Sequence, residues 1–199
     1  FDVPFDKRIF ESYDVVGFSV MTPQAPDAYL LNKLLNKEYP SLTTVIGGSH
    51  ARYYLGSVMN LPEDIAFDFI VSQDGWMPMY KIAIGEVKKG KKSVLFNENI
   101  PLKDVSPPSR PLNLMKKYNF SIAGVSAFHT ITALGCPFTC NFCEAGGEKL
   151  RKFSDSMINK DLETIAITHK ELGNEKNAVM IFDDVGLMSP VQVESLSKL

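Results

Sequence analysis

The sequence predicts an α/β fold in two units. In the first half of the chain, short apolar runs alternate with stretches of helical periodicity, as they do in a parallel sheet whose strands are connected through helices. Residues 100–112 then contain four prolines and show no periodicity, which is typical of a linker. A second series of strand, helix and strand follows, and this order is typical of the opening of an α/β barrel.

The first unit is predicted to cover residues 1–99. Its strands are rich in β-branched and apolar residues, and they are expected at residues 13–21, 43–48, 67–71 and 92–97. The clearest helix is expected at residues 27–38, where apolar residues recur at helical spacing, and shorter ones at residues 51–59 and from Met77. These strands are too few for a complete doubly wound domain, so the remaining half of that fold is expected upstream of Phe1.

The second unit is predicted to cover residues 129–199, after a linker at residues 100–128. Its elements are expected as a strand at residues 129–134, a helix at 157–172, a strand at 177–184 and a helix from Ser189. In an α/β barrel the reactive groups lie at the carboxyl ends of the strands. The cysteines of the chain and the pair Asp183–Asp184 occupy the ends of the two predicted strands, so both are expected at that end of the barrel.

Composition excludes several classes of protein. The 199 residues are 45% hydrophobic and 22% charged, which is ordinary for a globular protein and argues against disorder and against a disulfide-dense scaffold. The formal net charge of -2 predicts no broad attraction to nucleic acid or to anionic lipid. No apolar run approaches the ~20 residues that span a bilayer, and no signal-peptide pattern opens the chain, so a cytoplasmic location is predicted. Because the chain starts without Met and ends inside a predicted helix, it is expected to be a segment of a longer protein.

One short loop contains all the cysteines of the chain, with the spacing C-x3-C-x2-C: Cys136, Cys140 and Cys143. Thiolates ligate iron–sulfur clusters, and a [4Fe–4S] cube normally takes four of them. Three ligands would leave one iron with an open position, which suits a reactive site better than a structural one. Gly135 permits a tight turn before the first cysteine. Phe138 and Phe142 are expected to shield the loop from water.

This motif resembles the radical S-adenosylmethionine (SAM) superfamily, in which an aromatic residue precedes the third cysteine, as Phe142 does here. The resemblance implies that the three cysteines hold a [4Fe–4S] cluster and that the amino and carboxylate groups of SAM occupy the open iron. An electron donor such as ferredoxin or flavodoxin is the implied partner, and one electron from the cluster cleaves SAM to a 5′-deoxyadenosyl radical. Phe142 would lie near the adenine of SAM, and Arg151 matches a basic position often found in the superfamily.

Further residues resemble the cobalamin (B12)-binding branch of that superfamily. Asp183 and Asp184 are similar to its acidic pair after the second barrel strand and are implied to contact the cofactor; the alternative is a helix cap or a loop acid. Ser19, Gly47 and Gly48 follow strands of the first unit, where small residues let a large planar cofactor approach the backbone. The resemblance therefore implies a partial flavodoxin-like (Rossmann-like) cobalamin-binding domain, followed by the first β/α units of a radical SAM partial TIM barrel.

The implied function is that of a B12-binding radical SAM enzyme, which carries out methyl transfer or a rearrangement on an unknown substrate. This segment alone is not expected to turn over substrate, because the barrel stops early and any loop with a cobalt-ligating histidine is absent. Three other interpretations are open. The chain is a radical SAM enzyme without cobalamin, a non-enzymatic module in which zinc binds the cysteines and His129, His50 or His169, or an inactive fragment.

Overall fold

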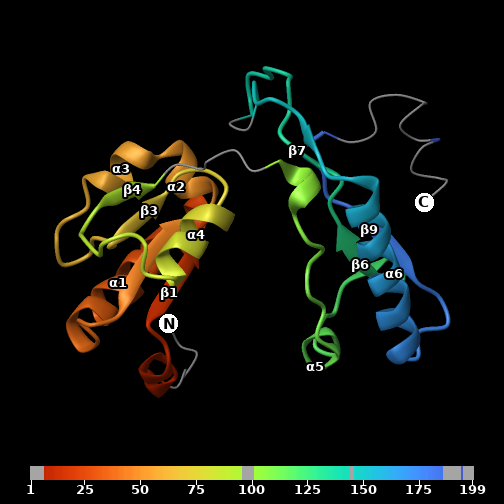
Figure 1. Ribbon diagram of the computed structural model, residues 1–199, viewed down its shortest axis with the longest axis horizontal. Coiled ribbons are helices and arrows are strands. Elements are labelled where there is room, and N and C mark those ends of the chain that lie inside the picture. Colours follow the sequence, from red (N-terminus) through yellow and green to blue (C-terminus); the bar gives the residue numbers. More distant parts are fainter. Residues whose placement is uncertain (1–6, 96–100, 144–145, 186–193, 195–199) are drawn as a thin grey trace. The chain divides into compact units, whose positions relative to one another are not determined.

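In the computed structural model, the chain divides into two units between Ile100 and Pro101 (Figure 1). The structure describes residues 7–95, 101–143, 146–185 and 194. The helix expected from Ser189 lies outside these residues, apart from Glu194. Within the described ranges, no helix is long and apolar enough to cross a membrane.

Four parallel strands form the sheet of the first unit, in the order β1-β2-β3-β4 (Figure 1). Their bounds are Val15–Ser19 for β1, Thr43–Gly47 for β2, Phe69–Val71 for β3 and Ser93–Leu95 for β4. β1 and β2 pair along their full length, so that Ser19 lies opposite Gly47. The parallel α/β sheet predicted for this unit is confirmed, and the first three predicted strands form with shorter spans than expected.

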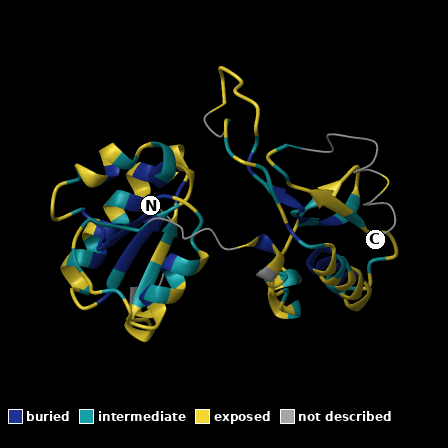
Figure 2. Ribbon diagram, turned by 45° about the horizontal axis from the view of Figure 1, so that its top comes forward, coloured by how far each residue is buried: buried dark blue, intermediate teal, exposed yellow. Residues whose placement is uncertain are grey.

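Helices cover both faces of this sheet, because successive side chains along a strand point to opposite sides. The helices are α1 at Ala25–Glu38, α2 at Ser49–Tyr53, α3 at Leu55–Met59 and α4 at Trp76–Ala83, with 3-10 helices η1 at Lys7–Ser12 and η2 at Thr22–Gln24. Ile46 and Ile70 pack with residues of α1, α2 and α3. Val45 and Phe69, their neighbours in the strands, pack on the other face with Ile82 of α4. These strands are the most buried part of the unit (Figure 2).

In the second unit, β6 and β9 form a parallel pair that is connected through α6. The elements in chain order are η3 at Leu102–Asp104, α5 at Leu112–Met115, β5 at Ser121–Ile122, β6 at Val125–Thr130, β7 at Ala133–Leu134, β8 at Arg151–Lys152, α6 at Asp155–Glu171 and β9 at Ala178–Ile181. β5 pairs antiparallel with β6, and β7 pairs antiparallel with β8. This part of the chain therefore holds one β-α-β unit, and the barrel beyond it stays a prediction.

The strand expected at residues 129–134 is displaced in the structure. β6 begins at Val125 and ends at Thr130, and β7 is a separate short strand. The last β6–β9 pair joins Thr130 to Ile181, and the N–H of Thr132 then donates to the side chain of Asp183 at 2.7 Å. Beyond the last strand pair, the carboxylate of Asp183 replaces a backbone carbonyl as the acceptor. The pattern of apolar residues in the sequence does not predict this change.

Residues 101–128, expected as a linker, contribute to the core of the second unit. Leu102 is 4% exposed and packs with Phe153. Arg110 donates from Nε and Nη2 to the carboxylate of Asp161 on α6, at 3.0 and 2.9 Å. The prolines of this segment prevent long regular elements, but they do not prevent packing.

Candidate functional site

The cysteine loop leaves β7 through a turn that requires glycine. Gly135 has a φ of 88°, and a Cβ atom there would lie 2.5 Å from the carbonyl oxygen of Lys149. The chain returns where Glu148 donates its N–H to the carbonyl of Cys136 at 2.9 Å. The tight turn predicted at Gly135 is therefore confirmed, and it fixes the direction in which the loop starts.

The cysteines are free thiols in the structure. Cys136 is half-buried at the base of the loop, whereas Cys140 and Cys143 are exposed and joined by a turn in which Cys143 N donates to the Cys140 carbonyl at 3.0 Å. Among the residues that the structure describes, no three His, Cys, Asp or Glu side chains are grouped as ligands of a metal ion. The ligands of a cluster bind separate iron atoms, so they need not converge on one point. Three thiols in one loop fit a cluster by the chemistry of the donor set.

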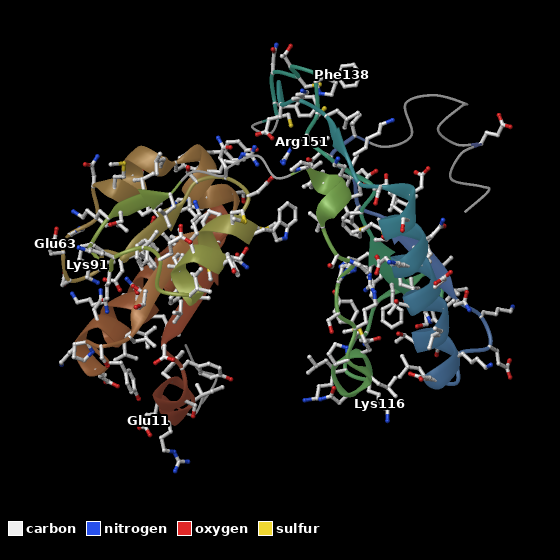
Figure 3. The ribbon with its side chains drawn as sticks, in the orientation of Figure 1. Glu11, Glu63, Lys91, Lys116, Phe138 and Arg151 are labelled. Carbon is white, nitrogen blue, oxygen red and sulfur yellow. The ribbon has the colours of Figure 1, made fainter. Side chains whose placement is uncertain are left out.

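The two aromatic residues of the loop do not shield it. Phe138 is 53% exposed and Phe142 is 91% exposed, so the expected protection from water is wrong. Figure 2 shows the loop as an exposed extension of the second unit, and Figure 3 shows Phe138 farther out than Arg151. Arg151 lies opposite Leu134 in the β7–β8 pair, and Leu134 comes shortly before Cys136 in the chain. Contact of Phe142 with the adenine of SAM stays a prediction.

Asp183 and Asp184 follow β9 and bind the backbone that leads into the cysteine loop. Asp183 accepts from the N–H of Thr132 at 2.7 Å, from the Thr132 hydroxyl, and from the N–H of Ala133 at 3.2 Å. Asp184 accepts from the N–H of Gly135 at 2.7 Å. Both acids therefore have partners within the protein, whereas their contact with SAM stays a prediction.

A pocket of about 410 Å³ lies at the carboxyl ends of β1, β2 and β3 in the first unit. Ser19, Gly47 and Gly48, which the sequence predicts to face a cofactor, all line this pocket. Val45 of β2 and Met79 of α4 also line it, and they belong to the cluster that packs between the sheet and α4. The volume and the mostly apolar walls are typical of small-ligand pockets.

Backbone contacts between two strand-end loops build the edge of this pocket. Val20 N donates to the carbonyl of Gly47, and His50 N donates to the carbonyl of Val20, each at 2.9 Å. Gly48 has a φ of 86°, and a Cβ atom there would lie 2.6 Å from Val20 N, so a side chain would push the loops apart. The imidazole of His50 is buried, with Nε2 at 2.7 Å from the hydroxyl of Tyr29.

A second hollow, of about 350 Å³, lies beside β6 and was not predicted from the sequence. His129 lines it between the rings of Tyr118 and Phe182, at centroid distances of 5.8 and 5.5 Å. This histidine is the nearest candidate for a zinc ligand in the sequence, but the ring contacts described here are aromatic. Strand alternation could have located it, because Phe128 and Thr130, its neighbours in β6, face α6.

The chain is similar to a protein of Pyrococcus horikoshii that bears the name uncharacterized methyltransferase. The two sequences are 25% identical over 177 residues, which cover 80% of this chain and 38% of that protein. The chain thus spans less than half the length of this relative. Because four-fifths of the chain is aligned, the similarity reaches into both units. No family model matches the chain.

Proposed function

We propose that this chain is part of a B12-binding radical SAM enzyme that transfers a methyl group to an unidentified substrate. The observation that carries the proposal is the cysteine loop, in which three free thiols with C-x3-C-x2-C spacing follow the strands that open a β-α-β unit. In an α/β barrel this end of the strands carries the reactive groups. Phe142, the aromatic residue before the third thiol, adds to the resemblance.

Cys136, Cys140 and Cys143 would hold a [4Fe–4S] cluster in this enzyme. Thiolates rather than thiols bind iron, so loading the loop releases the protons of these side chains. The exposure of Cys140 and Cys143 leaves them accessible for assembly of a cluster. A bound cluster supplies the electron for the reductive cleavage of SAM, and a protein such as ferredoxin or flavodoxin would be its electron donor. With three protein ligands, the loop leaves one iron for SAM.

The pocket of the first unit would take part of cobalamin in the same enzyme. Ser19, Gly47 and Gly48 give it a wall of small side chains, which lets a planar group lie against the backbone. Apolar side chains such as Val45 and Val71 cover its floor, so a flat ring would lose water on entering. The glycine at position 48 keeps the two loops beside the pocket in contact, because they touch only without a side chain there.

Methyl transfer is the reaction class that the comparison favours. The relative from Pyrococcus horikoshii carries the word methyltransferase in its name and aligns with parts of both units. A rearrangement, the other reaction considered from the sequence, has no such support. Because the relative is much longer than this chain, we propose the activity for the protein in its full length.

Metal and cofactor analysis of the full-length protein, purified and reconstituted without oxygen, tests this proposal. We expect about four iron and four sulfide per chain and a brown colour that is lost in Cys140→Ala. Thr139→Ala, which changes the adjacent exposed side chain, should keep the iron. Added cobalamin should change its visible spectrum on binding. One zinc per chain and no iron would contradict the proposal, and iron without cobalamin binding would restrict it to a radical SAM enzyme that lacks B12.

A further inference from the structure

We propose that Asp183 and Asp184 are positioning residues that hold the root of the cysteine loop, residues 132–135, in the place a cluster requires. The inference rests on the proposed function and deepens it. It assigns these two carboxylates a task other than contact with SAM, since each already accepts hydrogen bonds from the backbone that leads to Cys136.

The two acids reach the loop root from a distant part of the sequence. They are separated by about 50 residues from the amides that they bind, and they come close because β9 pairs in parallel with β6. Asp183 accepts hydrogen bonds from the N–H groups of the first two residues of the root, and Asp184 accepts one from the N–H of Gly135. Consecutive side chains at one strand end thus hold three of the four residues of the root.

Burial explains why the root needs these acceptors. Thr132 is 5% exposed and Ala133 is 2% exposed, and Gly135 is buried as well, so solvent has little access to replace a lost partner. A buried N–H without an acceptor is costly, and a carboxylate is a stronger acceptor than a neutral group. Gly135 also has no room for a side chain, since a Cβ atom there would lie 2.5 Å from the carbonyl oxygen of Lys149.

We call the hydrogen bonds from the loop root to Asp183 and Asp184 the clamp. The clamp determines the position of Cys136, the first cysteine of the loop. Cys136 directly follows the root and is half-buried, whereas the other two thiols lie in the exposed part of the loop. A cluster binds all three, so a root that moves changes the position of one sulfur relative to the other two. Loss of the clamp should therefore lower cluster retention before SAM is added. A residue that only contacts the ammonium of SAM would leave the cluster intact and weaken SAM binding.

Amide hydrogen exchange on the full-length, iron-free protein tests the clamp without any cofactor. In Asp184→Ala we expect the Gly135 amide to exchange about 10- to 100-fold faster, because a hydrogen bond to a charged group is lost. Asp184→Asn should stay close to the unmodified protein, since the amide oxygen can still accept from Gly135. Glu175→Ala is the matched control, because it removes an exposed carboxylate from the same unit.

Iron content and SAM affinity of the same variants complete the test. Asp184→Ala should retain less iron than Glu175→Ala, and Asp184→Asn should retain iron and bind SAM like the unmodified protein. Unchanged exchange at Gly135 in Asp184→Ala, with full iron and weaker SAM binding, would overturn the clamp in favour of direct contact. Failure of the unmodified protein to load iron would instead count against the proposed function, and the exchange result would still decide whether the clamp exists.

Discussion

The two units hold their strand-end loops by different means. In the first unit, the loops after β1 and β2 are joined backbone to backbone through Val20 and His50, and Gly48 lets them touch. In the second unit, the loop after β7 is tied through the side chains of Asp183 and Asp184. A contact between backbone groups tolerates most substitutions except at the glycine, whereas the contact in the second unit needs a side chain that accepts hydrogen bonds at two positions.

This difference follows the exposure of the two regions. The pocket of the first unit is bounded by buried strand residues such as Val45 and Val71, and its shape is set before any ligand enters. The cysteine loop is exposed, and Asp183 and Asp184 hold its base. A preformed pocket suits a ligand of fixed shape.

The largest expected effect concerns a different side-chain contact of the second unit, the buried ion pair between Arg110 and Asp161. Arg110→Met should lower the free energy of unfolding of this unit by about 3–5 kcal/mol, because it leaves the buried carboxylate of Asp161 without its charged partner. Asp161 is 1% exposed, so water cannot replace that partner. Hydrogen exchange of the α6 amides measures the loss. Lys160→Met, at an exposed neighbouring position, is the control.

The double variant Arg110→Met/Asp161→Leu sharpens this test. Replacing both partners removes the unpaired charge, so the double variant should be more stable than Arg110→Met alone. Equal losses of stability in the single and double variants would show that an unpaired charge on Asp161 is not the cause of the loss.

The backbone joint of the first unit should be sensitive at one glycine. Gly48→Ala is expected to cost about 2–4 kcal/mol, because a Cβ atom would lie 2.6 Å from Val20 N at a φ of 86°. Denaturant unfolding followed through Trp76, the one tryptophan of the chain, reports on this unit. Gly56→Ala in α3 meets no atom within 4 Å and should be neutral or slightly stabilising. Equal stability of the two variants would remove the argument for a close backbone joint.

A smaller effect is expected at the histidine beside this joint. Tyr29→Phe should cost about 1–2 kcal/mol, since it leaves the buried Nε2 of His50 without the Tyr29 hydroxyl. Burial also raises the pKa of the Tyr29 hydroxyl above its ordinary value of 10.0. The stability that the neutral hydroxyl contributes is therefore fully present below pH 10.0 and is lost as the pH rises through the raised pKa. Unfolding measured between pH ~9 and ~11 should show a steeper alkaline loss for the unmodified protein than for Tyr29→Phe. Parallel pH profiles would contradict this account.

The smallest effect should come from an exposed ion pair. Lys33 lies 2.8 Å from Asp64 and lowers the pKa of that carboxyl. Lys33→Met should move the pKa of Asp64 back up towards its ordinary value, as an NMR titration of the carboxyl would show. The unfolding free energy near neutral pH should hardly change, because solvent screens exposed pairs. A large loss of unfolding free energy in Lys33→Met would contradict this expectation, because it would mean that an exposed ion pair stabilises the first unit substantially.

The sequence predicted the parts of the fold that periodicity and glycine encode. The short apolar runs at Val15–Ser19 and Thr43–Gly47 locate the first two strands, and Gly48 and Gly135 mark the two tight turns. The cysteine spacing marks the loop without any structure. These signals are local, so a single sequence contains them.

Contacts between distant residues were not predictable in the same way. The bonds from Asp183 to Thr132 depend on strands that pair across about 50 residues. Arg110 was assigned to a linker, because the surrounding prolines hide a side chain that reaches Asp161. The exposure of Phe142 also depends on how the loop leaves the sheet. Such features depend on tertiary contacts between distant parts of the chain, which composition and motif spacing do not specify.

Electron paramagnetic resonance of the reduced, full-length protein, reconstituted without oxygen, is the decisive test of SAM binding at the proposed cluster. We expect the signal of a reduced [4Fe–4S] cluster that changes when SAM is added, because SAM would bind the iron that the three cysteines leave open. A folded protein that loads iron but gives the same signal with and without SAM would contradict it.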